Sequence, residues 1–431
     1  MSYLPEKFIE NMKKQLPQDE WEAFFAVYEK KPFKGIRVNP LKGGRYATNA
    51  IEPLLGAPVP WEKNGFYTDC EKVGASPLHH AGLFYSQEPS AMLAAPLLEV
   101  QAGERVLDLC SAPGGKGTQL ACEMDGKGII VLNEPIFARA KILSQNVERM
   151  GVRNAVVTNE YPDRIAQKFV GYFDKVLVDA PCSGEGMFRK NADEALKEWS
   201  EDNVALCAAR QKEILHCATQ VLRTGGRLVY STCTFSEAED EGQVRDYLQN
   251  HPEMRLIKQE KLYPHRADGE GHFAALFEKI GDTLTGIQKE IKPRVSREAE
   301  KAYRAFEKEF FRAPFANRLH EANGILYALP DGVFDWTGIK VLRVGVRLGE
   351  YKNGRFEPSH SLAACVARAE CKRAVDLALG DPRVEKYLRG ETIDCDISNG
   401  WLVVCADGLP LGLGKAVNGI VKNHLPKGLR F

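Results

Sequence analysis

The feature that most constrains the fold is a series of five short apolar segments in the middle of the chain, separated by stretches with helical character. They are rich in Val, Ile and Leu without alternating polar residues, which is typical of parallel strands covered on both faces. A helix is expected over residues 136–150, after Pro135 and before Gly151. The pattern predicts an α/β fold with a doubly wound, Rossmann-like sheet. The five segments are residues 105–109, 128–132, 155–158, 175–178 and 227–230.

A chain of 431 residues is too long for one ordinary core, so domains are expected on both sides of the sheet. Before the sheet, a helical start is followed by the strand-like GIRVNPLK. After the sheet, residues 289–318 are rich in charged residues and have a helical pattern, with Pro293 and Pro314 as expected boundaries. The Gly-rich remainder is typical of a small β-rich module. The predicted division is an N-terminal segment 1–93, a sheet domain 94–282, a first C-terminal segment 283–372 and a β-rich module 373–431.

Composition narrows the class of protein. Hydrophobic residues make up 44% of the chain, within the globular range. No apolar run approaches the ~18 residues that a spanning helix needs, and the first residues do not have the pattern of a signal peptide. A cytoplasmic protein without a membrane partner is therefore expected. The 11 cysteines are scattered and lack paired CxxC spacing, so neither a disulfide framework nor a metal site is expected.

The formal net charge of the chain is zero, so composition alone does not indicate a nucleic-acid partner. Charge is nevertheless segregated at the end of the chain. From Leu411 onward the sequence contains Lys415, Lys422, Lys427 and Arg430 and no acidic residue. A surface that binds RNA is most simply placed there.

A loop of small residues follows the first predicted strand and opens a helix. Such a loop lets backbone N–H groups approach a ligand at the switch point of a doubly wound sheet. The GxGxxG pattern of a dinucleotide fold is absent, and Glu134 follows the next strand, where a carboxylate can accept the hydroxyls of a ribose. Together the loop and Glu134 favour a nucleoside cofactor over a plain turn. The loop comprises Cys110, Ser111, Ala112, Pro113, Gly114, Gly115 and Lys116.

Two cysteines and a carboxylate follow the fourth and fifth predicted strands. Asp179 and Cys182 lie in VLVDAPCSGEG, and Cys233 lies in YSTCT. Taken singly, each cysteine is more often a small buried hydrophobe. Two at the carboxyl ends of adjacent strands, one beside a carboxylate, indicate a functional site.

These residue types suit methylation of cytosine at carbon 5. That carbon is too electron-poor to attack a methyl sulfonium unaided, whereas a thiolate adding to carbon 6 creates an enamine that can take the methyl group. A carboxyl group at ring nitrogen 3 and the exocyclic amine stabilises the charge that develops. A base must then remove the carbon-5 proton, and a paired target base must first be flipped out.

The motifs CSAPGGK, LNEP, VLVDAPCSGEG and YSTCT, in this order, resemble those of the Nol/Nop/Sun family of RNA 5-methylcytosine methyltransferases. RVNPLK and YSQEPSAM look like its N-terminal signatures, and YPHRADGEGHFAALFEK looks like its late catalytic motif. IKVLRVGVRLGEYKNGRFEPSH and PLGLGKAVNGIVKNHLPKGLR resemble the bacterial RsmF-type members. Those modify small-subunit ribosomal RNA and carry a C-terminal PUA-like RNA-binding module.

The resemblance implies a class I S-adenosylmethionine-dependent methyltransferase core with an N-terminal RNA-binding segment and a PUA-like module. It assigns attack on the base to Cys233, proton removal or product release to Cys182, holding of the base to Asp179, and a basic role beside cofactor and substrate to Lys116. The residues from Cys110 to Lys116, with Glu134 and Asp179, are expected to line the pocket for S-adenosylmethionine. The expected partner is 16S ribosomal RNA or the small subunit, and the expected state is a monomer.

One segment departs from the family pattern. After the third strand the family often has an aspartate near the adenine, whereas this chain has TNEYPDRI. The favoured register puts Tyr161 there, and Asn159 or Asp163 are alternatives.

Three other functions compete with this interpretation. A transfer-RNA cytosine methyltransferase shares every catalytic motif, but the C-terminal third argues against it. An inactive RNA-binding assembly factor is disfavoured by the intact Asp179, Cys182 and Cys233. An amine methyltransferase uses Asn/Asp-Pro-Pro-Tyr and needs no paired cysteines.

Overall fold

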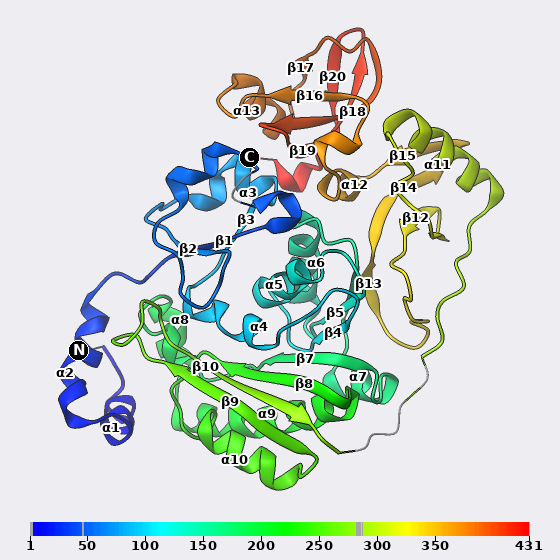
Figure 1. Ribbon diagram of the computed structural model, residues 1–431. Helices are drawn as coiled ribbons and strands as arrows, with labels where there is room; N and C mark the ends of the chain where they lie inside the picture. Colours follow the sequence, from blue (N-terminus) through cyan, green and yellow to red (C-terminus); the bar gives the residue numbers. More distant parts are fainter. Residues whose placement is uncertain (1–2, 45–46, 282–285, 287, 431) are drawn as a thin grey trace.

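A central eight-stranded sheet organises the computed structural model, which describes residues 3–44, 47–281, 286 and 288–430 (Figure 1). In spatial order its strands are β13 (Val341–Val344), β6 (Ala155–Thr158), β5 (Ile129–Asn133), β4 (Arg105–Asp108), β7 (Phe173–Asp179), β8 (Leu222–Thr232), β10 (His272–Lys279) and β9 (Met254–Leu262). The strands from β6 to β8 are parallel, and the other three pair antiparallel. The chain runs from β4 to β6 on one side and returns through β7 and β8 on the other, so the switch point lies between β4 and β7. The predicted doubly wound sheet is confirmed.

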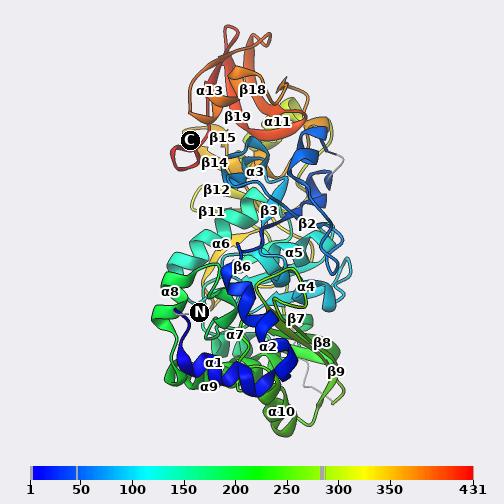
Figure 2. The same ribbon diagram turned by 90° about the vertical axis from the view of Figure 1, so that its left-hand side faces the viewer.

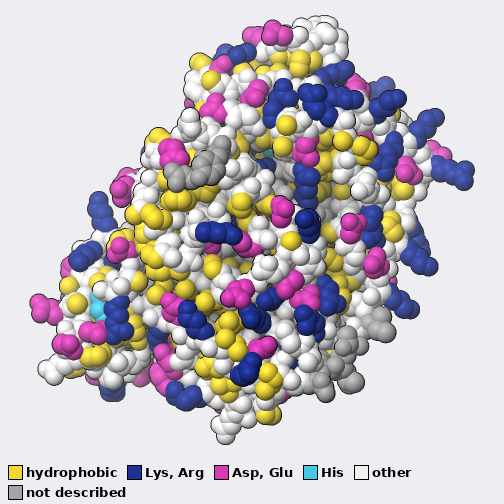
Figure 3. All heavy atoms as spheres, in the orientation of Figure 1, with side chains coloured by type: hydrophobic (Ala, Val, Ile, Leu, Met, Phe, Trp, Pro, Cys, Tyr) yellow, Lys and Arg dark blue, Asp and Glu magenta, His cyan; other side chains and the backbone are white. Residues whose placement is uncertain are grey.

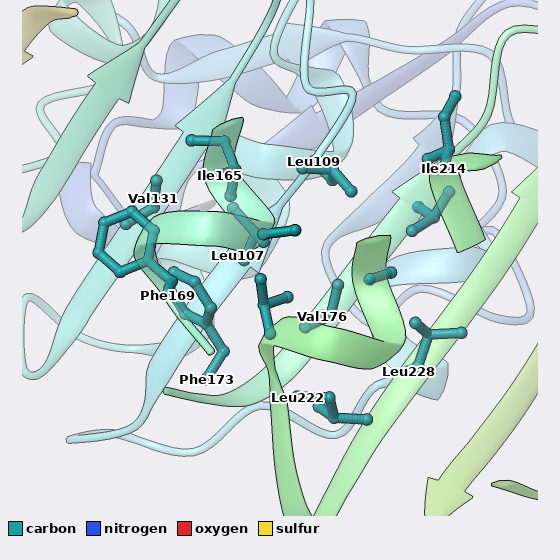
Figure 4. Close-up of a cluster of buried hydrophobic side chains, with 14 of the residues drawn as sticks. Leu107, Leu109, Val131, Ile165, Phe169, Phe173, Val176, Ile214, Leu222 and Leu228 are labelled. Atoms are coloured by element: carbon teal, nitrogen blue, oxygen red, sulfur yellow. The ribbon is translucent and has the colours of Figure 1, made fainter. Parts of the chain in front are cut away.

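Helices cover both faces of the sheet, which explains why its strands are apolar throughout. Val106 faces the core on one side and Leu107 faces the core on the other, because successive side chains of a strand alternate. Figure 4 shows the second of these cores, in which Leu107, Val131 and Val176 of the sheet meet Phe169 and Ile214 of the helices. The first face is covered by α4 (Ala94–Leu97), α5 (Gly115–Glu123) and α6 (Phe137–Arg149), and the second by α7 (Pro162–Lys168), α9 (Glu201–Val221) and α10 (Glu241–Asn250).

The predicted helices and strands of the central domain lie at the predicted positions in the chain, but several differ in length from the prediction. The helix expected at 136–150 is α6, with Ile136 and Met150 as its caps. The strands expected at 175–178 and 227–230 extend at both ends. Of residues 289–318, only α11 (Arg297–Phe310) is helical, because the chain around Pro293 is extended and the helix ends before Pro314. The predicted boundary between 282 and 283 lies outside the described residues.

The N-terminal part has two pieces. Helices α1 (Glu6–Gln15) and α2 (Trp21–Ala26) pack on Phe188 and Phe235 of the loops after β7 and β8. Figure 2 shows these two helices in blue against the helical layer of the central sheet. A small antiparallel sheet follows, in which β1 (Gly35–Val38) lies between β2 (Gly65–Tyr67) and β3 (Phe84–Ser86), with α3 (Pro77–His80) beside it.

The C-terminal third is rich in strands, as predicted. Beside α11 a four-stranded sheet is formed by β11 (Leu319–Ala322), β12 (Ile325–Ala328), β14 (Val346–Lys352) and β15 (Arg355–Pro358), followed by α12 (His360–Ala364). A five-stranded sheet is then formed by β16 (Ala374–Leu377), β18 (Asn399–Ala406), β19 (Leu409–Val417), β20 (Ile420–Asn423) and β17 (Ile393–Asp394), with α13 (Pro382–Leu388) against it. The short helix α8 (Ala192–Glu198) precedes α9.

The two ends of the chain share one hydrophobic core, which the sequence did not indicate. Ile36 and Phe84 of the N-terminal sheet pack in the same cluster as Leu402 and Val404 of β18. In Figure 1 the blue N-terminal sheet lies directly beneath the red and orange C-terminal module. The predicted division between the sheet domain and the first C-terminal segment also fails at β13. This strand belongs to the predicted segment 283–372, but it pairs with β6 and extends the central sheet. Among the described residues no helix is long and apolar enough to cross a membrane.

Candidate active site

The loop after β4 is held in place from both neighbouring strands and from the N-terminal sheet. The Ser111 N–H donates to the Asn133 carbonyl at the end of β5 (2.8 Å). Gly114 has a φ of 111°, a conformation that favours glycine. The fully buried Arg37 of β1 donates to the Gly115 carbonyl (3.1 Å) and to Thr118 Oγ1 (2.9 Å) in the first turn of α5. The N-terminal signature RVNPLK thus contributes directly to the geometry of this loop.

Asp108 is a functional candidate that the sequence analysis missed. It ends β4 and is fully buried, and neither of its carboxylate oxygens, nor the Ser111 hydroxyl, has a hydrogen-bond partner in the described part of the chain. Burial raises the pKa of Asp108 to about 7, and the nearby Ser111 hydroxyl offsets only part of that effect. A Cβ at Gly117 would lie 2.5 Å from Ser111 Oγ and 2.9 Å from Asp108 Oδ2. The loop therefore encloses buried polar atoms suited to a cationic or hydrogen-bonding ligand group.

Glu134 lies directly after β5, buried beside the loop. Its Oε1 accepts from the Ile136 N–H (2.9 Å), and Arg139 lies 3.4 Å from its Oε2. Arg139 also donates to the Ala112 carbonyl (3.0 Å), so one guanidinium joins Glu134 to the loop. The carboxylate is thus fixed at the position expected for the ribose of a nucleoside.

The three alternatives for the adenine contact lie in different surroundings. Asn159 is buried and donates from Nδ2 to the carbonyls of Glu134 and Pro135 (both 2.8 Å). Tyr161, which the favoured register selected, precedes α7 and is 70% exposed, and Asp163 is exposed on α7. Of the three, Asn159 is therefore the residue that contacts the segment after β5 that contains Glu134.

Lys116 and Asp179 form an ion pair across the switch point, with Nζ 2.9 Å from Oδ2. Ser231 Oγ on β8 donates to Asp179 Oδ1 (2.8 Å). Burial opposes both charges, but the pairing outweighs it, so the pKa of Asp179 is lowered and that of Lys116 is raised. Asp179 is only half-buried, and at neutral pH it is an ionised carboxylate within reach of a ligand.

The two cysteines lie together, as their strand positions predicted. Their sulfur atoms are 3.4 Å apart, and the Cys233 N–H also donates to Cys182 Sγ (3.4 Å). The hydrogen bond with Cys233 and burial raise the pKa of the Cys182 thiol well above its ordinary value. Cys182 therefore remains a neutral thiol able to donate to the Cys233 sulfur. All 11 cysteines are free.

Buried carboxylates tie the two cysteine loops to each other. Glu239 accepts from the Ser183 N–H (2.9 Å) and hydroxyl (2.5 Å) and from Gln211 Nε2 (2.9 Å). Glu185, in the loop with Cys182, accepts from the Phe235 N–H (3.0 Å) in the loop with Cys233. These contacts fix the spacing of the sulfur atoms, and nothing in the local sequence distinguishes the two glutamates from solvated ones.

Comparison with known proteins identifies the family. Family models match four consecutive parts of the chain: the N-terminal domain of 16S rRNA methyltransferase RsmF at residues 4–89, 16S rRNA methyltransferase RsmB/F at 95–278, the RsmF first C-terminal domain at 305–366, and the RsmF PUA domain at 374–431. Ribosomal RNA small subunit methyltransferase F of Vibrio vulnificus is 34% identical over 99% of this chain and 98% of its own. The chain belongs to the RsmF family of 16S rRNA methyltransferases. The corresponding protein of Vibrio cholerae is 32% identical over 99% and 97% of the two chains.

A solved structure shares the fold of this chain. NSun6 from Pyrococcus horikoshii with SFG, an S-adenosylmethionine analogue, has a TM-score of 0.59, with 21% identity, over 65% of this chain and 99% of that one. At this identity the likeness shows the fold alone. As an RsmF family member the chain is a ribosomal RNA methyltransferase whose cofactor is S-adenosylmethionine, and the unpaired Asp108 and the fixed Glu134 fit that cofactor. Among the described residues no cluster of His, Cys, Asp and Glu could hold a metal ion.

Proposed function

We propose that this RsmF family member methylates carbon 5 of a cytidine in 16S ribosomal RNA through a covalent bond between Cys233 and the base. The observation that carries the proposal is the pair of sulfur atoms 3.4 Å apart, at the ends of adjacent strands and beside the Lys116–Asp179 ion pair. An amine or ribose methyltransferase has no use for two such thiols. The inactive assembly factor is disfavoured because Asp179 and the two cysteine loops are still held in place by hydrogen bonds and an ion pair.

The proposed chemistry begins at Cys233. Its thiolate adds to carbon 6 of cytosine, a carbon–sulfur bond forms, and the electron pair of the 5,6 double bond becomes available at carbon 5. Asp179, ionised and half-exposed, accepts from the exocyclic amine and holds the base. The neutral Cys182 thiol donates its S–H to the Cys233 sulfur.

The remaining steps restore the aromatic base. After carbon 5 has taken the methyl group, its proton is removed, and the electron pair of that C–H bond re-forms the double bond as the Cys233–carbon 6 bond breaks. Cys182, adjacent to Cys233, is assigned to this proton removal or product release. To act as the base it first gives its own thiol proton to water and then takes the carbon-5 proton as the thiolate. Lys116 keeps Asp179 ionised throughout.

The residues proposed to hold the cofactor lie at the ends of β4 and β5. S-adenosylmethionine supplies an electrophilic methyl group. The loop from Cys110 to Lys116 offers backbone groups at the start of α5, Asp108 offers a buried carboxylate to a cationic group, and Glu134 accepts from ribose hydroxyls. Asn159 and the exposed Ile136, two residues after Glu134, are proposed to contact the adenine.

We propose that RNA is captured by the C-terminal module, residues 373–431, together with the N-terminal segment 1–93 that shares its core. Lys415 and Lys422 are exposed and directly opposite each other on β19 and β20. Like charges in this arrangement are unfavourable unless an anion lies across them. Trp401, opposite Lys415 on β18, adds an aromatic ring, whereas Arg430 is occupied by the Leu425 carbonyl. Lys and Arg side chains gather over the C-terminal third in Figure 3.

The experiment that tests this function is bisulfite sequencing of ribosomal and transfer RNA from a strain lacking the gene and from the same strain complemented with it. One or more 16S cytidines should lose protection in the deletion strain and regain it on complementation. Loss confined to transfer RNA would support the rival substrate, and no loss in either RNA would contradict the cytosine chemistry. Purified protein with S-adenosylmethionine and the affected RNA should reproduce the modification.

A further inference from the structure

A buried histidine that the proposed chemistry does not use lies behind Asp179. His272 is the first residue of β10, and only 1% of its side chain is exposed. Its Nε2 lies 3.9 Å from Asp179 Oδ1, which is too far for a hydrogen bond. Neither ring nitrogen has a hydrogen-bond partner among the residues that the structure describes. A buried unpaired polar group is unfavourable, so an imidazole at this position needs an explanation.

Strand pairing brings this imidazole to the active site. Phe273 pairs with Thr232 of β8, so His272 lies beside the end of β8, where Cys233 follows. Gly271 has a φ of 113°, and a Cβ there would lie 2.4 Å from the Phe235 ring. The chain therefore enters β10 through a glycine turn that only a residue without a side chain permits, and the turn places His272 in the crevice.

The protonation state of His272 limits what it can do. Burial and the neighbouring Lys116 lower its pKa to about 3, so the ring is neutral at neutral pH. A ring this weakly basic is a poor acceptor for the proton of a thiol. His272 is therefore not the base that activates the nucleophile. A neutral imidazole does carry one N–H donor, and the carboxylate oxygen Asp179 Oδ1 lies on its Nε2 side.

We propose that His272 is a positioning residue for Asp179, donating from Nε2 to Oδ1 when the target base engages the carboxylate. A movement of about 1 Å closes the gap to a normal N–H···O distance. Lys116 already holds Oδ2 and Ser231 holds Oδ1, so His272 supplies a third contact that keeps the carboxylate aimed at the exocyclic amine. The inference rests on the proposed cytosine chemistry, because that chemistry gives Asp179 a base to hold.

The test compares His272→Phe, which keeps an aromatic ring without a donor, with His272→Gln, which keeps an N–H donor. His272→Phe should lower kcat for RNA methylation about 10- to 100-fold and leave the KM for S-adenosylmethionine unchanged. His272→Gln should restore most of the rate. His251→Phe, on a histidine at the end of α10 remote from the site, is the matched control and should keep the wild-type rate.

The pH profile separates positioning from packing. The charged or titratable groups facing Asp179 are Lys116 on α5, Asp108 at the end of β4, Cys110 after it and His272 on β10. Loss of the His272 N–H donor raises the pKa of Asp179 in the RNA complex, where the hydrogen bond is formed. The acid limb of kcat, which reports that complex, should therefore move to higher pH in His272→Phe but not in His272→Gln.

Two results would overturn the inference. One is a wild-type rate and acid limb in His272→Phe. The other is an equal loss in both variants with an unshifted acid limb and lowered melting temperatures, which would mean that the ring only fills space. A wild-type protein that methylates no cytidine would instead remove the proposed function, so the two failures are distinguishable.

Discussion

The two sides of the active site differ in how their buried polar atoms are satisfied. On the cysteine side, Glu239 accepts three hydrogen bonds and Glu185 joins the two loops. On the cofactor side, the oxygens of Asp108 and the Ser111 hydroxyl have no hydrogen-bond partner among the described residues. Satisfied networks fix the protein's own geometry, whereas unpaired buried groups mark where a ligand completes the structure. The comparison separates the residues that set the position of the proposed nucleophile, Cys233, from those proposed to bind the cofactor.

The largest expected effect concerns the cysteines themselves. Cys233→Ala should lower methylation by on the order of 10⁴-fold or more and abolish any covalent adduct, because no thiolate remains to activate the base. Cys182→Ala should still attack and methylate but fail to release, so a protein–RNA species should accumulate as a slow band on a denaturing gel. Adducts from Cys233→Ala and none from Cys182→Ala would reverse the assignment. Unchanged activity in both variants would make both thiols structural.

The second effect tests whether the network on the cysteine side sets the geometry. Glu239→Ala leaves the Ser183 N–H buried and unpaired, which destabilises the protein by about 1–3 kcal/mol. It also removes one of the two acceptors of Gln211 Nε2, which still donates to the Pro181 carbonyl (3.0 Å). We expect kcat to fall about 100-fold, with the Kd for S-adenosylmethionine unchanged by calorimetry.

Glu239→Gln provides the matched comparison. Its remaining oxygen can still accept both N–H groups while the Ser183 hydroxyl turns to accept from the new amide, so it should retain most of the rate. Glu237→Ala, at an exposed glutamate two residues away, is the neutral control. Equal losses in Glu239→Ala and Glu239→Gln would show that the charge matters and not the acceptors.

The third effect tests the cofactor side through pH. The folded-state pKa of Asp108 is raised to about 7 from 3.8, so the folded protein keeps a proton that the unfolded chain releases. Stability of the cofactor-free protein should therefore fall as pH rises from about 4 to 7. Asp108→Asn should remove this component and raise the melting temperature at pH 8, while weakening S-adenosylmethionine binding about tenfold.

Asp331→Asn, at an exposed aspartate, is the control and should change neither the melting temperature nor the affinity for S-adenosylmethionine. If Asp108→Asn lowers the melting temperature and spares cofactor affinity, Asp108 is a structural residue and the contrast between the two sides fails.

The smallest effect lies outside the catalytic crevice. Replacing both Lys415 and Lys422 by Thr should lower RNA affinity several-fold and reduce the slope of log K against log salt by roughly 1.4, for two single-strand phosphate contacts. Relief of the repulsion between the opposed lysines should raise stability slightly. The same changes at Lys212 and Lys258, which form ion pairs elsewhere, should leave the slope unchanged. Equal slopes for both pairs of changes would place RNA recognition away from the C-terminal module.

Residues at the carboxyl ends of parallel strands were predictable from sequence because their placement follows from topology. Asp179, Cys182 and Cys233 meet for this reason, and Glu134 lies beside the loop as expected. The sequence analysis missed Asp108 because a polar residue at the end of a strand is usually a solvent-exposed residue at the start of a turn. The burial of Asp108 depends on α5, whose Gly117 lies against the carboxylate.

Other features depend on pairings between distant segments. Strand β13 joins the sheet from beyond the predicted boundary, and His272 reaches the crevice only through the pairing of β10 with β8. The sequence of a short apolar strand does not specify which other strand it pairs with, so these contacts could be identified only from the structure.

The core shared by the two ends of the chain has a consequence for its synthesis. Ile36 and Phe84 emerge early from the ribosome, but the side chains that cover them belong to the last strands. Roughly 290 residues separate β3 from β16, which at ordinary elongation rates is a delay of roughly 15 to 60 s. During that interval the apolar side chains of the small N-terminal sheet lack the C-terminal part of their core. The nascent protein must therefore finish translation before the sheet that positions Arg37, and with it the cofactor loop, can become stable.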